Sequence, residues 1–80
     1  MEKSEILKKV NNIFIDVLDN EDIKLTNETK ASDIAEWDSL SNIQLVVAIE
    51  HEFGLRFSSE EIPSWKNVGD MVNSVLSKLK

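Results

Sequence analysis

Three segments of the chain space their apolar residues as an α-helix does, and this periodicity most constrains the fold. In residues 4–18 the apolar positions recur at intervals of three, four and seven, which places them on one helical face. Similar stripes cover residues 39–53 and about 67–79. The 80-residue chain has no cysteine, so no disulfide can hold it and the stripes must pack on one another. The sequence therefore predicts an all-α fold with one domain over residues 1–80.

Each predicted helix has an inward face. The first helix should bury Ile6, Leu7, Val10, Ile13, Phe14, Val17 and Leu18. The second should bury Leu45, Val46, Ile49 and Phe53, and the last, capped by Asn67, should bury Val68, Met71, Val72, Val75, Leu76 and Leu79. Leu40, Ile43 and Val47 fall partly outside the second stripe. The second helix therefore carries more apolar surface than one buried face needs, which is a hint of binding.

The connections between the helices differ in length. Residues 19–38 show no sustained period, and Ile23, Leu25, Ile34 and Trp37 are spaced as anchors that pin a long loop to the core. A calcium-binding loop is excluded there, because lysines 24 and 30 occupy the positions of its glycine and its bidentate glutamate. Gly54 should end the second helix. Beyond it, Ser58 and Glu61 fit a capping box for a short helix that Pro63 ends. The prediction is a small four-helix bundle of three long helices and one short one, with a long loop between helices 1 and 2.

Charge narrows the classes of partner. The net charge of −6 would repel nucleic acid and favours partners with basic surfaces. It also favours a monomer. No apolar run approaches the length of a membrane span, and the charged N-terminus is unlike a signal peptide, so we expect a cytoplasmic protein without a membrane partner. No metal site is expected.

Ser39, in the stretch "EWDSLSNIQLV", invites three interpretations. A hydrolytic nucleophile needs a nearby base, yet the single histidine, His51, lies three turns further along the predicted helix and suits an exposed surface position. A second interpretation is that Asp38 and Ser39 simply begin a helix, with Asp38 as its N-cap. A third is attachment, because an oxygen at a helix N-terminus lies among unpaired amides that suit a phosphodiester. Spacing alone favours the second interpretation over the third.

A family resemblance changes that balance. The run "WDSLSNIQLVVAIEHEFGLRF" and the later "KNVGD" resemble an acyl carrier protein, with likeness from about residue 6 to 79. The resemblance implies a carrier rather than an enzyme, with 4′-phosphopantetheine from coenzyme A on Ser39 and acyl groups held as thioesters. It also implies that Asp38 caps the helix and faces the magnesium ion used by the phosphopantetheinyl transferase. The other implied partners are acyl-loading and acyl-processing enzymes.

The resemblance further assigns contact and pocket residues. Leu40, Val47 and Glu50 are the implied partner contacts, and the acyl-pocket candidates are Phe57, Ile62, Trp65 and Val68. Trp65 stands where the family has a mid-sized aliphatic residue. It either packs in the core or fills the pocket and restricts the cargo to short or polar acyl groups.

Departures from the family pattern leave the biosynthetic pathway of this carrier unassigned. Ser41 and Gln44 replace acidic residues, His51 interrupts the acidic cluster of Glu50 and Glu52, and Trp37 replaces a small residue. Fewer negative charges on the second helix weaken the electrostatic attraction that guides the protein towards basic enzymes. The pattern resembles stand-alone carriers of polyketide, aminoacyl or surface-polysaccharide pathways more than a carrier of fatty acid synthesis. The alternatives are an aminoacyl or peptidyl carrier of a nonribosomal pathway, and an acidic helical adaptor that is never modified.

Overall fold

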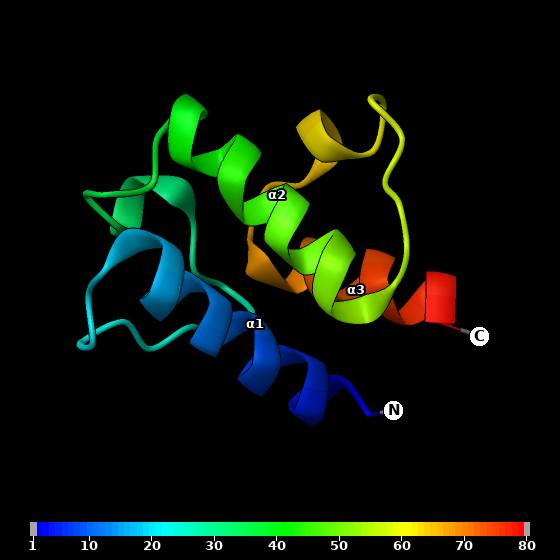
Figure 1. Cartoon of the computed structure of the whole chain (residues 1–80), viewed down its shortest axis with the longest axis horizontal. Coiled ribbons are helices and arrows are strands. Elements are labelled where there is room, and N and C mark those ends of the chain that lie inside the picture. Colours follow the sequence, from blue (N-terminus) through cyan, green and yellow to red (C-terminus); the bar gives the residue numbers. More distant parts are fainter. Residues whose placement is uncertain (1, 80) are drawn as a thin grey trace.

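The computed structural model describes residues 2–79, and this part of the chain is all-α, as predicted. It contains the helices α1 (Lys3–Leu18), α2 (Ser39–Phe53) and α3 (Val68–Leu79), with short 3-10 turns η1 (Ala31–Asp33) and η2 (Ile62–Ser64) in the connections. Helix α1 packs against both α2 and α3. Figure 1 shows α2 crossing in front of α3, with the long first connection at the side of the molecule where α1 ends and α2 begins.

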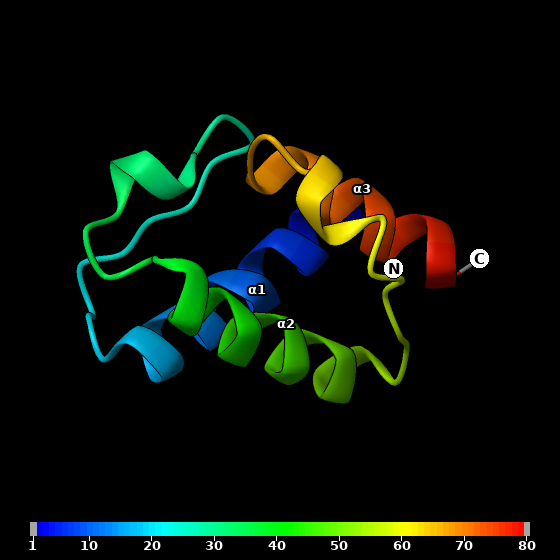
Figure 2. The same ribbon diagram turned by 90° about the horizontal axis from the view of Figure 1, so that it is seen from above.

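The core consists of the predicted apolar faces. Its buried members are Ile6, Val10, Phe14, Leu18, Ile23, Leu25, Leu45, Ile49, Val68, Met71, Val72 and Val75. Val46 is also buried, and the other residues predicted to face inward pack against the core as half-buried neighbours, with one exception. Leu79, for which the periodicity predicts an inward position, is 38% exposed, because the last turn of α3 projects at one end of the molecule beyond the elements that could cover it (Figures 1 and 2).

The long connection is anchored as predicted but is not structureless. Ile23 and Leu25 are buried, and the Leu25 N–H donates to Asn11 Oδ1 at 2.7 Å. The turn η1, which the sequence pattern does not reveal, begins where the Lys30 N–H donates to Asp33 Oδ2 at 3.0 Å. This turn is held by a hydrogen bond to a side-chain carboxylate and not by a face of buried apolar residues, so its sequence lacks the apolar periodicity that predicts a helix.

The same connection holds the start of α3. The backbone N–H groups of Val68 and Gly69 donate to the carbonyl oxygens of Thr29 and Asn27, at 2.8 and 2.9 Å. Figure 2 shows the connection reaching the N-terminal end of α3. The first amides of a helix have no partner within it, so these bonds from the loop satisfy donors that would otherwise be unpaired. Asn67 contributes the expected cap, since its Oδ1 accepts from the Asp70 N–H at 2.9 Å.

The predicted fourth helix is shorter than expected. The capping box is present, because Ser58 Oγ accepts from the Glu61 N–H at 3.2 Å and Glu61 Oε2 accepts from the Ser58 N–H at 2.8 Å. The next residues form only the 3-10 turn η2, and Pro63 lies inside this turn rather than ending it. Proline is tolerated in a first turn, where its missing N–H would have had no partner. Glu61 also pairs with Lys78 Nζ at 3.0 Å and so ties this segment to α3.

Gly69 provides the first test of this packing. A Cβ atom on Gly69 would lie 2.8 Å from the Asn27 carbonyl oxygen, so Gly69→Ala must push the loop from α3. We expect it to lower the free energy of unfolding by about 1–3 kcal/mol, measured by urea denaturation.

Gly54 is the matched control. Its φ of 64° ends α2 in the left-handed conformation, and a Cβ atom there would meet nothing within 4 Å. Gly54→Ala should cost about 1 kcal/mol through backbone conformation alone. Asparagine tolerates this conformation, so Gly54→Asn should recover part of the loss while Gly69→Asn should not. Equal behaviour of the two sites would contradict the account of the loop contact.

Candidate functional site: the N-terminus of helix α2

Asp38 caps α2, as predicted. Its Oδ1 accepts from the backbone N–H groups of Leu40 and Ser41, at 3.0 and 2.9 Å. The Ser41 hydroxyl oxygen accepts from the Asp38 N–H at 2.8 Å, which completes a reciprocal capping box. Both bonds to the carboxylate end on Oδ1, and Oδ2 accepts none from residues 2–79. One carboxylate oxygen is therefore engaged by the helix, and the other makes no hydrogen bond within residues 2–79.

Ser39 is the first residue of α2, and it is exposed. Its side chain makes no hydrogen bond to the part of the chain that the structure describes. His51 is also exposed, as expected, and lies twelve residues further along the same helix, or about 18 Å along its axis. His51 is therefore too far along α2 to activate Ser39 as a hydrolytic nucleophile.

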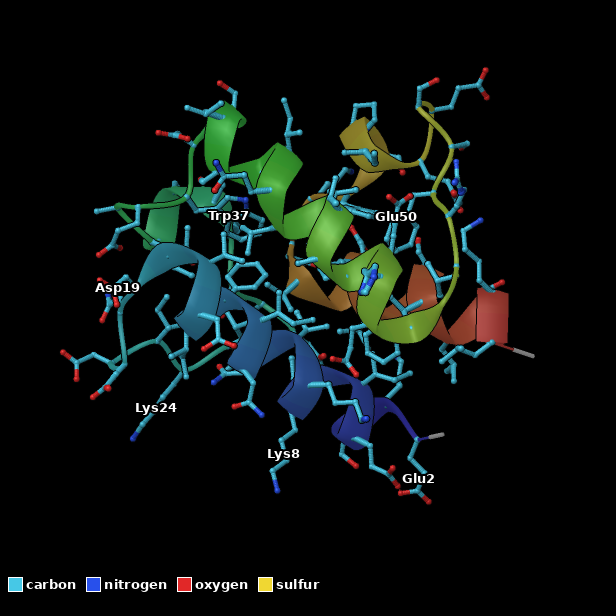
Figure 3. The ribbon with its side chains drawn as sticks, in the orientation of Figure 1. Glu2, Lys8, Asp19, Lys24, Trp37 and Glu50 are labelled. Atoms are coloured by element: carbon cyan, nitrogen blue, oxygen red, sulfur yellow. The ribbon has the colours of Figure 1, made fainter. Side chains whose placement is uncertain are left out.

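A cleft of about 290 Å³ opens beside Ser39. It is lined by Ala31 of η1, by Trp37, Asp38, Ser39 and Asn42 at the start of α2, and by Ile62, Trp65, Lys66, Asn67 and Met71. Trp37 is held on both sides: its ring meets Phe14 edge to face at 4.9 Å, and its indole N–H donates to Asn42 Oδ1 at 2.9 Å. Figure 3 shows Trp37 between the first turns of α2 and the end of α1. The cleft thus has fixed walls from three separate segments.

The four acyl-pocket candidates do not line one cavity. Ile62 and Trp65 line the cleft beside Ser39, whereas Val68 is fully buried in the core. Phe57 lies behind Trp65, with the two rings edge to face at 4.8 Å. The Trp65 indole N–H donates to Ser74 Oγ at 2.8 Å, so this side chain is held both by the ring of Phe57 and by its own indole N–H.

The three predicted partner contacts differ in their exposure. Leu40 and Val47 are 68% and 58% exposed, which suits contact with another protein. Glu50 is half-buried, and its Oε2 accepts from the Phe57 N–H at 2.7 Å. Figure 3 shows Glu50 on the side of α2 that faces the segment after it. Glu50 therefore positions this segment within the molecule, a role that the sequence pattern does not indicate.

Ile43 is not among the predicted contacts, although it is 62% exposed. A signal for it is present in the sequence, because Leu40, Ile43 and Val47 succeed one another at intervals of three and four and must share one face of α2. Together these three side chains form an exposed apolar stripe, which begins beside Ser39.

Hydrogen bonds lower the pKa of Asp38. The largest contribution is the Ser41 backbone N–H, and the Leu40 N–H contributes more weakly; both donate to the carboxylate and favour its ionised form. The cap is therefore fully charged at neutral pH, and its bonds are charge-assisted.

Metal and membrane sites are not found in the described residues. Within residues 2–79, no group of three or more histidine, aspartate or glutamate side chains is arranged to hold a metal ion. No helix in this range has both the length and the apolar character needed to cross a bilayer.

Comparison with known proteins adds the decisive observation: residues 8–75 match the family model described as "Phosphopantetheine attachment site". The chain belongs to the acyl carrier protein family. Such a protein carries acyl groups on phosphopantetheine between enzymes and is not itself an enzyme. The cofactor and the non-catalytic role implied by the sequence resemblance are thereby confirmed. The family also implies a phosphopantetheinyl transferase and acyl-processing enzymes as partners.

Individual relatives agree over nearly the whole chain. The acyl carrier proteins of Thermosynechococcus vestitus and Petrotoga mobilis are each 34% identical over 79 residues, which is 99% of this chain and 98% and 93% of theirs. The solution structure of holo acyl carrier protein from Geobacter metallireducens is 42% identical, with a TM-score of 0.87 over 92% of this chain and 85% of that one. The acyl-carrier-like fold predicted from the sequence is thus confirmed.

The lowered pKa of Asp38 predicts how stability varies with pH. Folding favours the ionised carboxylate, so its contribution is complete above about pH 5 and is lost as the pH falls through the folded-state pKa, below the ordinary value of 3.8. Asparagine caps helices well without titrating, whereas alanine does not cap. Melting temperatures should show wild type above Asp38→Asn at pH 7 and convergence of the two in acid, with Asp38→Ala lowest at pH 7. Parallel curves for wild type and Asp38→Asn would contradict this assignment.

Proposed function

We propose that Ser39 Oγ is the atom that holds phosphopantetheine in this acyl carrier protein. The observation that carries the proposal is an exposed serine hydroxyl that makes no hydrogen bond to residues 2–79, on the first residue of α2 and at the edge of the cleft. Ser39 lies within the residues matched by the family model. The attachment joins the serine oxygen to the phosphate as a phosphodiester, and the arm supplies a thiol that bears the acyl group as a thioester.

The electrostatics of the helix start support this position. The N-terminus of α2 carries partial positive charge, which favours a phosphodiester on its first residue. Asp38 is a negative neighbour, but its Oδ1 is engaged by two backbone N–H groups. Its Oδ2, which accepts no bond from residues 2–79, is suited to face the magnesium ion of the transferase. Asp38 thus serves both as the helix cap and as a group that assists modification.

Intact mass spectrometry tests the attachment residue. The unmodified chain is incubated with coenzyme A, magnesium and a broad-specificity phosphopantetheinyl transferase. Wild type should gain the mass of one phosphopantetheine, and Ser39→Ala should gain none, because no oxygen remains at that position.

Ser41→Ala is the matched control. It removes the other serine of the first turn and weakens the capping box, but it leaves Ser39 in place, so it should still gain one arm. Modification of a folded Ser39→Ala chain would place the attachment elsewhere. A folded wild type that gains no arm would favour an unmodified adaptor.

The position of Trp65 is the basis of a proposal about the acyl cargo. This side chain occupies the wall of the cleft beside Ser39, held there by Phe57 and Ser74. A large fixed ring at that position leaves less room for a hydrocarbon chain than an aliphatic side chain would. We propose that Trp65 restricts sheltered cargo to short or polar acyl groups.

Thioester hydrolysis tests the role of Trp65. Holo protein is loaded with an acetyl or a dodecanoyl group, and the rate of hydrolysis is measured for wild type and Trp65→Leu. Each buried methylene contributes about 0.8 kcal/mol. If Trp65→Leu shelters two more methylenes than wild type does, its dodecanoyl thioester should be hydrolysed about tenfold more slowly. The acetyl thioester should be unaffected.

Phe57→Leu separates the cargo effect from loss of packing. This variant also removes the contact between the two rings, but Phe57 does not line the cleft. It should therefore leave hydrolysis of the long-chain thioester unchanged. Protection of the dodecanoyl group in wild type equal to that of the acetyl group would contradict the proposal.

A pathway outside fatty acid synthesis is the proposal that best fits the surface of α2. Ser41 and Gln44 bring no charge to this helix, and Glu50 uses its carboxylate internally, so less negative charge is left for docking onto basic enzymes. A polyketide, aminoacyl or surface-polysaccharide pathway is compatible with these residues. Elongation with a fatty acid synthase set at the rate of its own carrier would contradict this proposal.

A further inference from the structure

The cleft beside Ser39 carries polar groups that the attachment itself does not use. Lys66, Asn42 and Asn67 bring N–H donors to its walls, and Asp38 brings a carboxylate. The other walls are mostly apolar, and both indole rings are among them. A concave, mostly apolar site with a few placed polar groups is typical of a pocket for a small organic ligand, and about 290 Å³ is close to the lower limit of such pockets.

The two asparagines of the cleft have their oxygen atoms engaged within the molecule. Asn42 Oδ1 accepts from the Trp37 indole N–H, and Asn67 Oδ1 accepts from the Asp70 N–H, each at 2.9 Å. Since both donors are N–H groups, the bonded atom of each asparagine must be its oxygen. Neither side-chain NH2 group makes a hydrogen bond to residues 2–79. Both asparagines therefore have donors available for the carbonyl oxygens of a ligand in the cleft.

Lys66 has a fixed backbone, and its side chain has no anionic partner among the described residues. Its N–H donates to Asp70 Oδ2 at 3.0 Å, which sets its place at the entry to α3. Its ammonium group forms no salt bridge with a carboxylate of residues 2–79, although Asp38 lines the same cleft. Among the described residues that line the cleft, Lys66 is the one with a positive charge. The cleft therefore has a cation available for an anionic group.

The start of α2 has few donors left for an anion on Ser39. Asp38 Oδ1 accepts from two backbone N–H groups of the first turn, and the Asp38 carbonyl oxygen accepts from a third at 2.9 Å. A phosphodiester on Ser39 would also place a second negative charge beside the ionised Asp38. Because neighbouring like charges repel each other, a compensating cation is favourable there. Lys66, across the cleft, is placed to supply it.

We propose that the cleft holds the arm itself, with Lys66 paired to the phosphodiester on Ser39. Asn42 and Asn67 donate to the amide carbonyls of the arm, and the apolar walls cover its methyl and methylene groups. Lys66 precedes α3, so the pairing joins the start of α2 to the start of α3 in the modified protein. This inference rests on the proposed attachment at Ser39. An arm in the cleft leaves less room there for cargo, in agreement with the role proposed for Trp65.

The test begins with holo protein whose single arm on Ser39 is verified by intact mass. The thiol of the arm is alkylated with iodoacetamide, a small neutral reagent, and the rate is compared with that of free pantetheine. An arm held in the cleft should react more slowly than free pantetheine. Nuclear Overhauser contacts between the methyl protons of the arm and the ring protons of Trp37 and Trp65 should locate the arm.

Matched variants assign the contacts. Lys66→Gln should speed alkylation by up to about fivefold, as expected for loss of one exposed ion pair. Lys8→Gln makes the same change in net charge on α1, where Figure 3 shows the side chain projecting away from α2, and should leave the rate unchanged. Asn67→Ser removes the amide donors and should also speed alkylation, while serine still caps α3. Added salt should speed alkylation of wild type more than that of Lys66→Gln.

Two results on verified holo protein would overturn the inference and leave the attachment at Ser39 intact. One is the absence of Overhauser contacts between the arm and the walls of the cleft. The other is an equal alkylation rate for Lys66→Gln and Lys8→Gln. A folded wild type that gains no arm, or gains it at a residue other than Ser39, would instead contradict the proposed function, and this inference with it.

Discussion

The edge-to-face contact between Phe14 and Trp37 is the interaction that positions the N-terminus of α2, where we propose that the arm of this acyl carrier protein is attached. It joins α1 to the last residue before the helix cap, and it thereby fixes where the long first connection ends. The Trp37 indole N–H then reaches one turn into α2 through Asn42. Asp38 and Ser39 are thus set on a framework of aromatic packing and hydrogen bonds, although both are exposed.

Much of this arrangement could be predicted from the sequence, because apolar spacing and cap residues act locally. The three helices, the Asp38 cap, the Asn67 cap and the Gly54 stop are all specified by residues close together in the chain. The features that escaped prediction depend on contacts across segments. Glu50 has the sequence context of a surface residue, yet its acceptor role is decided by where the chain runs after it leaves α2. The exposure of Leu79 likewise depends on which elements cover the end of α3.

Two carboxylates hold the segment after α2 in place, and both are residues that composition alone would count as surface charge. Glu50 bonds the backbone of Phe57, and Glu61 bonds the backbone of Ser58 and pairs with Lys78 of α3. The pKa of Glu61 is lowered, first by the Ser58 N–H and then by Lys78. This segment carries Ile62 and Trp65 to the cleft. These two carboxylates therefore help to position the cleft wall that contains Ile62 and Trp65, and only the other acidic side chains are available to contact partners.

The cleft has one more property, which results from the identity of its walls. Trp37 and Trp65 are the two tryptophans of the chain, the chain has no tyrosine, and both indoles line the cleft from opposite segments. The ultraviolet emission of the protein therefore originates at the cleft beside Ser39, the residue to which we propose that the arm is attached. Arrival or departure of a group would change the polarity around both rings, so this carrier contains its own optical reporter of whether the cleft is filled.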